Sequence, residues 1–332
     1  MDFRKQFASS VMANNAIEKL KKVKYASLCY KVFRFFLLIG VCYVFLFPVL
    51  YMISSAVRTP ESVNDPSVIW VPKELTLESF AKAAEALKIE SSLWVTVSLD
   101  LVSAVLQMVS CAFVGYGFAR FKFKEKNFLF AMVIFTIIVP PQTTMMSNFI
   151  NYRYFDFAGV STLIEAITGT SATVNLLDTN WTFYLPAIFG MGIKSGLVIV
   201  VFRQFFRGMP RELEESATID GCGSFQAFLR VIVPNAGSVF LTIFLFSVVW
   251  YWNDYYLSAM YFSKDYPMSV MLSQLRSGLQ NNGVVSSLLF STDELRTYIQ
   301  AGALLTIAPL LVMYIILQRF FVESIERCGI VG

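Results

Sequence analysis

The feature that most constrains this sequence is a set of four long stretches without a single charged side chain, at residues 35–57, 127–152, 231–253 and 297–318. A helix needs roughly 20 mostly apolar residues to cross the apolar core of a bilayer, and each stretch is at least that long. Two further stretches, 91–119 and 179–202, carry one charge each, Asp100 and Lys194. The pattern therefore predicts an all-α integral membrane protein with six transmembrane helices.

The composition agrees with a membrane protein and excludes several other classes. Of the 332 residues, 56% are hydrophobic and only 15% are charged, whereas about a quarter of the residues in a soluble domain are charged. Aromatic residues make up 16% of the chain, which excludes disorder because disordered chains contain few aromatics. The net charge of +4 is too small to indicate nucleic-acid binding.

Residue types that carry common chemistry are missing. Histidine is absent, and the five cysteines form no Cys-x-x-Cys pair, so zinc sites and histidine-based acid–base catalysis are not indicated. The sequence also lacks a phosphate-binding Gly-x4-Gly-Lys-Ser/Thr loop. We therefore expect no catalytic residue, no metal and no cofactor in this chain, and any ATP chemistry has to come from another chain.

The distribution of basic residues predicts the orientation and the domain boundaries. Lys and Arg number 27, and 18 of them fall on the side that holds both termini, which the positive-inside rule assigns to the cytoplasm. Residues 1–34 form a cytoplasmic segment, 35–320 the transmembrane domain and 321–332 a cytoplasmic tail. The first span is too long for a cleaved signal peptide and has too long a basic leader. Loops on the outer side are expected at about 58–90, 153–181 and 259–297.

The cytoplasmic loop 207–234 has the pattern of a helix–turn–helix. Pro210 suits the first turn of a helix, and glutamates follow where the helix dipole is positive. Gly221 suits the left-handed residue that stops this helix, Ser224 can cap a second one, and Pro234 ends it. The second helix has an apolar stripe formed by Phe225, Phe228, Leu229 and Ile232. An ordinary amphipathic connector is an equal alternative at this point.

This loop resembles the EAA loop, EAA-x3-G-x9-I-x-L-P, of the membrane subunits of bacterial ABC importers. The matching residues are Glu215, Ser216, Ala217, Gly221, Val231, Val233 and Pro234. Ser216 replaces the second alanine, and the two valines stand for Ile and Leu. Further strings place the resemblance in the carbohydrate-uptake branch, with its maltose-permease-like subunits. These strings are Thr59-Pro60-Glu61, residues 72–77, 115–120 and 139–142, and Trp252-Asn253-Asp254.

The resemblance implies a type I ABC importer permease fold and a non-catalytic permease subunit of an ATP-driven sugar importer, with oligosaccharides as the expected substrates. It also implies a second homologous permease chain, two ATPase subunits that bind the ATP, an extracytoplasmic sugar-binding protein, and a place in the bacterial inner membrane. By the same resemblance, the residues that dock on the ATPase are Glu215, Ser216, Ala217, Asp220 and Gly221.

A sugar path needs aromatic faces and polar side chains, and the end of span five offers both. Ser247, Trp250 and Asn253 share one helical face and are the candidate lining residues, whereas Asp254 is expected to pair with a basic group on a neighbouring chain. An aromatic belt at the membrane surface is the competing explanation for this segment.

A proton- or ion-coupled carrier is the alternative function, because Asp100, Lys194 and Asp254 are ionisable residues in or near spans. A membrane enzyme has little support in the sequence.

On the outer side, Thr76–Lys88 and Pro267–Leu279 read as amphipathic pieces and 153–181 as a polar loop. The binding protein is expected to dock on the acidic residues after span one together with Pro267–Leu279, although acidic residues that are merely solvated explain the pattern equally well. The acidic residues are Glu61, Asp65, Glu74, Glu78, Glu85 and Glu90.

Overall fold

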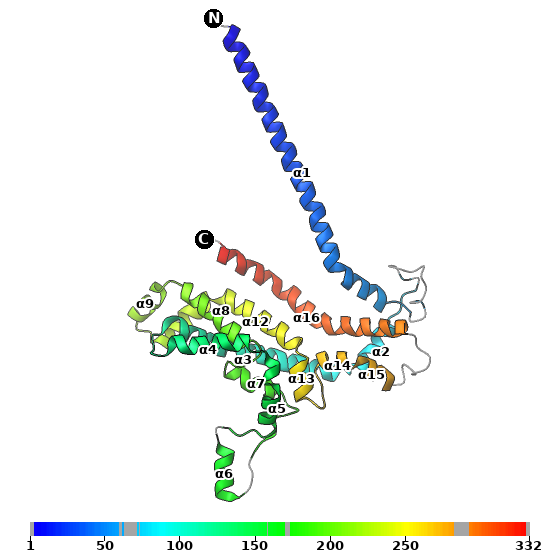
Figure 1. Ribbon diagram of the computed structural model, residues 1–332, viewed down its shortest axis with the longest axis vertical. Coiled ribbons are helices and arrows are strands. Elements are labelled where there is room, and N and C mark those ends of the chain that lie inside the picture. Colours follow the sequence, from blue (N-terminus) through cyan, green and yellow to red (C-terminus); the bar gives the residue numbers. More distant parts are fainter. Residues whose placement is uncertain are drawn as a thin grey trace.

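The computed structural model describes residues 3–59, 62, 72, 74–157, 159–169, 173–281 and 292–329. Regular structure in this part of the chain is helical, apart from two isolated bridges that pair Arg58 with Leu75 and Phe155 with Val174. The all-α fold is therefore confirmed. Figure 1 shows that most helices form one elongated bundle, from which the N-terminal helix extends far beyond the rest.

Three helices are long and apolar enough to cross a membrane alone: α1 (Phe3–Ala56), α3 (Ile89–Arg120) and α16 (Thr292–Gly329). They contain the predicted spans one, two and six. Because α1 starts at Phe3, most of the predicted cytoplasmic segment continues the first span as one helix. In the same way, α16 runs on through residue 329 into the predicted tail.

Spans three and four are each built from more than one helix. Span three comprises α4 (Lys126–Ile138), a 3₁₀ turn (Pro141–Thr143) and α5 (Met145–Arg153), because two adjacent prolines disfavour the helical conformation before them. Span four comprises α7 (Trp181–Ile188) and α8 (Ser195–Gly208).

Span five begins later than predicted. Its helix α12 (Gly237–Trp252) follows a bend of 79° from the segment Ser224–Asn235. By length and composition, this bent pair supplies a fourth span to the three long helices in the described part of the chain. The count of six spans stays a prediction.

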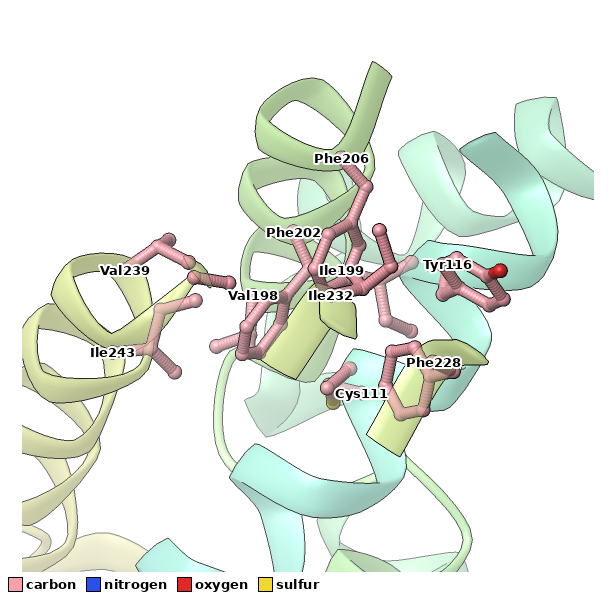
Figure 2. Close-up of a cluster of buried hydrophobic side chains, with 12 residues drawn as sticks. Cys111, Tyr116, Val198, Ile199, Phe202, Phe206, Phe228, Ile232, Val239 and Ile243 are labelled. Atoms are coloured by element: carbon pink, nitrogen blue, oxygen red, sulfur yellow. The ribbon is translucent and has the colours of Figure 1, made fainter. Parts of the chain in front are cut away.

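An aromatic core joins α3, α8 (Ser195–Gly208), α12 and the loop 207–234 (Figure 2). The ring of Tyr116 on α3 lies 4.6 Å from that of Phe228 in the loop, and Phe202 and Phe206 stack within α8 at 5.6 Å. Aromatic side chains bury large areas and gain further energy from pairing with one another. The loop is therefore held as part of the bundle rather than as a loose connection.

A second apolar cluster lies on the predicted outer side, where α2 (Glu78–Ala86), α14 (Met268–Ser273) and α15 (Leu275–Asn281) pack near α16. Both predicted amphipathic pieces are therefore confirmed as helical, the second with an interruption at Gln274. The buried face of α2 is Ser79, Ala83 and Ala86. The buried core of the cluster is Ala86, Leu87, Leu275, Leu279, Leu295 and Tyr298.

The segment 153–181 is not only a loop, which corrects the prediction for this region. It contains α6 (Val160–Thr168), which projects away from the bundle beyond α5 in Figure 1. Phe155 and Val174 exchange two backbone hydrogen bonds of 3.0 and 3.1 Å, which close the base of this projection. Its end is fastened to the residues after α13 (Tyr256–Tyr261) through Asp178.

Candidate coupling and transport sites

The first helix of the predicted coupling loop is present as α9 (Glu212–Ile219). Three glutamates occupy its first turn, where carboxylates stabilise the positive end of the helix dipole. Gly221 follows with a φ of +82°, and the Cys222 N–H donates to the Ala217 carbonyl at 2.9 Å. The prediction that Gly221 supplies a left-handed stop is confirmed. Figure 1 places α9 at the end of the bundle opposite α2 and α15.

The second helix of the loop differs from the prediction in three details. It is built from α10 (Ser224–Ala227), a π-helical turn (Phe228–Ile232) and α11 (Val233–Asn235). The cap position falls on Gly223 rather than Ser224. The segment ends at Asn235, one residue after Pro234 and directly before the bend of 79°, which is close to the predicted end. In the predicted stripe only Phe228 and Ile232 are buried, whereas Phe225 and Leu229 are exposed.

The five predicted docking residues do not all face outward. Glu215, Ser216, Asp220 and Gly221 are exposed, whereas Ala217 is buried within the chain. Ile219 is 86% exposed, which is unusual for a large apolar side chain and follows from no sequence pattern in this loop. The residues Glu214, Glu215, Thr218 and Ile219 line an open depression of about 440 Å³.

An ion pair that the sequence did not reveal fastens α9 to the end of α3. Glu214 Oε1 lies 2.9 Å from Arg120 Nε, and both side chains are largely buried. Arg120 also donates to the Met209 carbonyl at 2.8 Å, and the Tyr116 hydroxyl is within hydrogen-bonding reach of Glu214. Glu214 and Arg120 are far apart in the sequence, so no rule of residue spacing predicts their contact. The only sequence signal for Arg120 is its place in the string 115–120, which resembles the carbohydrate-uptake branch.

The candidate path residues on α12 have different environments. Ser247 is fully buried, Trp250 is half-buried and Asn253 is exposed, with its side-chain amide donating to the Val249 carbonyl at 2.8 Å. The structure thus places the three in different surroundings and does not confirm a shared lining. Their assignment to a sugar path stays a prediction.

The three ionisable residues that motivated the carrier alternative do not meet. Asp100 is buried, and its carboxylate oxygens have no hydrogen-bond partner among the described residues. The Asp254 carboxylate accepts hydrogen bonds from the Ser258 N–H and hydroxyl at 2.8 and 3.0 Å, so it already has partners within its own chain. The Lys194 ammonium lies 4.8 Å from the centre of the Trp250 ring.

Several known proteins resemble this chain in sequence. Three relatives are similar over most of their length. The Probable ABC transporter permease protein YurM of Bacillus subtilis is 24% identical over 91% of this chain and 87% of that protein. The Arabinooligosaccharides transport system permease protein AraQ of Halalkalibacterium halodurans is 24% identical over 88% and 93%. The Polygalacturonan/rhamnogalacturonan transport system permease protein YtcP of Bacillus subtilis is 25% identical over 83% and 89%.

A solved structure and a family model complete the comparison. The chain resembles a chain in the crystal structure of a bacterial ABC transporter involved in the import of the acidic polysaccharide alginate. The TM-score is 0.63 at 16% identity, over 88% of this chain and 96% of that one, which supports the fold of an ABC importer permease. The family model covers residues 111–327, well over half of the sequence. The chain therefore belongs to the family of binding-protein-dependent transport system inner membrane components.

Proposed function

We propose that this chain is one permease subunit of an ATP-driven importer of oligosaccharides in a bacterial inner membrane, with both termini in the cytoplasm. It works with a second homologous permease chain, two ATPase subunits and an extracytoplasmic sugar-binding protein, and the ATPases alone bind ATP. The substrate class is taken from relatives whose names refer to arabinooligosaccharides and polygalacturonan. The observation that carries the proposal is α9, an exposed helix tied into the bundle.

The coupling mechanism follows from how α9 is held. Ile219 and Glu215 present an apolar and an acidic contact to the ATPase, and Glu215 pairs with a basic residue there. On the face of α9 that packs on the bundle, the Glu214–Arg120 ion pair connects α9 to α3. Phe228 connects the rest of the loop to the aromatic core. When the ATPases close on ATP, α9 moves with them and carries the attached helices, which opens the path outward.

Reversing the charge at Glu215 tests this docking. Glu215→Lys removes the acidic contact and places a like charge against the basic residue of the ATPase, so sugar uptake by the reconstituted transporter should be abolished. The substitution lies on an exposed position and should leave the chain inserted and expressed. Glu125→Lys makes the same charge change on an exposed residue of another cytoplasmic loop and should retain uptake.

The stop residue and the energy source provide two further checks. Gly221→Asp strains the left-handed position and should also abolish uptake with normal insertion. An ATPase poison should stop uptake, while an uncoupler should spare it. Normal transport by both the Glu215 and the Gly221 variants would rule out the docking assignment, and sensitivity to the uncoupler alone would favour the proton-coupled carrier.

A further inference from the structure

Lys194 occupies a position that a membrane-embedded chain tolerates poorly. It lies in the interruption of span four between α7 and α8, has a φ of +55° and is exposed. Ionisable side chains within spans usually face the bundle interior or a water-filled path, where they find a partner of opposite charge. A non-glycine residue in the left-handed region is also a strained one, and such strain often persists at functional sites.

The described part of the chain supplies no acidic partner for Lys194. Asp254, the acidic residue at the end of α12, already accepts two hydrogen bonds from Ser258, and Asp100 is buried in the bundle. Among the described residues, no carboxylate lies within ion-pair distance of the Lys194 ammonium. Its contact is the aromatic ring of Trp250. An ammonium has three N–H donors, so it retains capacity to bind an anion that comes from outside this chain.

The surroundings of Lys194 are those that a sugar requires. The Trp250 ring offers an apolar surface for sugar C–H groups, and the exposed Asn253 amide, directly after the end of α12, offers a carbonyl oxygen to hydroxyl groups. Phe246 stacks on the same ring at 5.8 Å, so the ring has little free surface while Lys194 rests on it. An exposed cation–π contact is weak, and a carboxylate would displace it because charge-assisted hydrogen bonds are stronger.

We propose that Lys194 and Trp250 form a recognition site for the carboxylate of an acidic sugar, a uronate, in the transport path. The inference rests on the proposed function as a sugar importer and specifies its substrate class. The carboxylate draws the ammonium off the Trp250 ring, and the freed ring then contacts the sugar. A neutral sugar has no group to draw Lys194 away and passes poorly.

Matched sugars test this inference in the complete transporter, reconstituted in proteoliposomes with its own ATPase and binding protein. The probes are the trimers of galacturonate, mannuronate and guluronate, each paired with its carboxyl-reduced neutral counterpart. The wild type should import an acidic trimer faster than its neutral pair. Lys194→Gln should lower the ratio of acidic to neutral uptake about tenfold or more, the usual loss for one contact to a charged group. Lys194→Arg, which keeps the charge, should preserve most of the ratio.

Each other result decides against the site. Equal uptake of acidic and neutral trimers by the wild type, or an unchanged ratio in Lys194→Gln, would overturn it while leaving sugar import intact. Loss of both uptakes together with dissociation of the second permease chain would show that Lys194 pairs with that chain instead. Failure to import any of the six sugars while an arabinooligosaccharide is imported would overturn the site alone, whereas failure to import any of these oligosaccharides under ATP would contradict the proposed function itself.

Discussion

Gly221 has a left-handed backbone conformation and lies in the loop for which coupling is proposed. Its φ of +82° suits glycine far better than other residues, and a Cβ there would meet nothing within 4 Å. Gly221→Ala therefore adds backbone strain of about 1 kcal/mol and no steric clash. We expect this strain to loosen the end of α9 and to lower the number of sugars imported per ATP, measured with the reconstituted transporter.

A neighbouring glycine provides the control for that prediction. Gly223 has open space around its Cβ position as well, but its φ is −69°, which alanine adopts freely. Gly223→Ala should therefore leave the sugar-to-ATP ratio unchanged. Equal effects of both substitutions would mean that side-chain volume, and not the left-handed conformation, matters at this turn.

Single residues were predictable where a local rule fixes them. The stop at Gly221 follows from the sequence, since only its own backbone conformation is involved. The contact of Glu214 with Arg120 does not follow, because it depends on how α3 and α9 are placed relative to each other. The same holds for Ile219, whose exposure depends on which face of α9 packs on the loop.

At the scale of elements, α3 and α8 approach each other closely at a glycine. A Cβ on Gly115 would lie 2.6 Å from the Phe202 Cβ and 3.0 Å from the Arg203 backbone nitrogen, so α3 and α8 would have to separate. Gly115→Ala should destabilise the chain by about 1–3 kcal/mol, the usual cost of overpacking. Thermal unfolding in detergent measures this change.

Gly117, two residues further on α3, is the matched control. A Cβ there meets nothing within 4 Å, and alanine is the better helix former by about 1 kcal/mol. Gly117→Ala should therefore unfold at the same temperature as the wild type or slightly higher. A destabilisation as large as that of Gly115→Ala would show that close packing of α3 on α8 is not the cause.

Asp178 ties the projecting segment to the chain after α13 and makes this link sensitive to acid. Its carboxylate accepts hydrogen bonds from the Ser263 N–H at 2.5 Å and hydroxyl at 2.8 Å. Burial acts to raise the pKa of Asp178, but these hydrogen bonds and the adjacent Lys264 outweigh it and hold the pKa below its ordinary value. Because the folded pKa is lowered, the link contributes fully above the ordinary value of about 3.9. It is lost as the pH falls through the lowered value.

The Asp178→Asn variant should accordingly unfold at a lower temperature than the wild type at neutral pH, and the difference should shrink as the pH falls below about 3.9. Unfolding in detergent across this pH range measures the effect. Asp265→Asn, a nearby exposed position with a φ of +49° that asparagine tolerates, should unfold like the wild type. A difference for Asp178→Asn that stays constant throughout the acid range would mean that its charge is not responsible.

Hydropathy predicted which segments are apolar, but not where each helix breaks. The interruption of span three lies at Pro140 and Pro141, which a sequence marks as a site of bending without saying how far the helix opens. The interruption of span four contains Gly190, with a φ of +67°, and Gly192, so glycines mark it in the sequence. The left-handed φ of Lys194 has no such marker, because Lys194 is not glycine. Tertiary contacts therefore decide the conformation of Lys194, and a sequence pattern does not record them.

At the scale of the whole molecule, the predicted cytoplasmic and outer ends are built differently. The predicted cytoplasmic end presents a short helix, α9, whereas the predicted outer end presents α2, α14 and α15 around one apolar cluster (Figure 1). Glu74, Glu78, Glu85 and Glu90 are exposed near this end, and Glu61 and Asp65 lie outside the described residues. The order of the segments was predictable from charge and hydropathy, but the meeting of α2 with α15 depends on contacts distant in sequence.

Crosslinking from Ser273 tests whether the outer end receives the binding protein. Ser273 is exposed at the end of α14, and its hydroxyl donates to the Val270 carbonyl near it in the chain, so Ser273→Cys should not disturb the fold. Helix α14 packs near the apolar cluster formed by α2, α15 and α16. A protein bound to this end therefore lies close to residue 273. We expect a crosslink to the sugar-loaded binding protein in at least one nucleotide state. Gln226→Cys, on an exposed position of the cytoplasmic loop, should give none, and the absence of a Ser273→Cys crosslink in every state would favour acidic residues that are merely solvated.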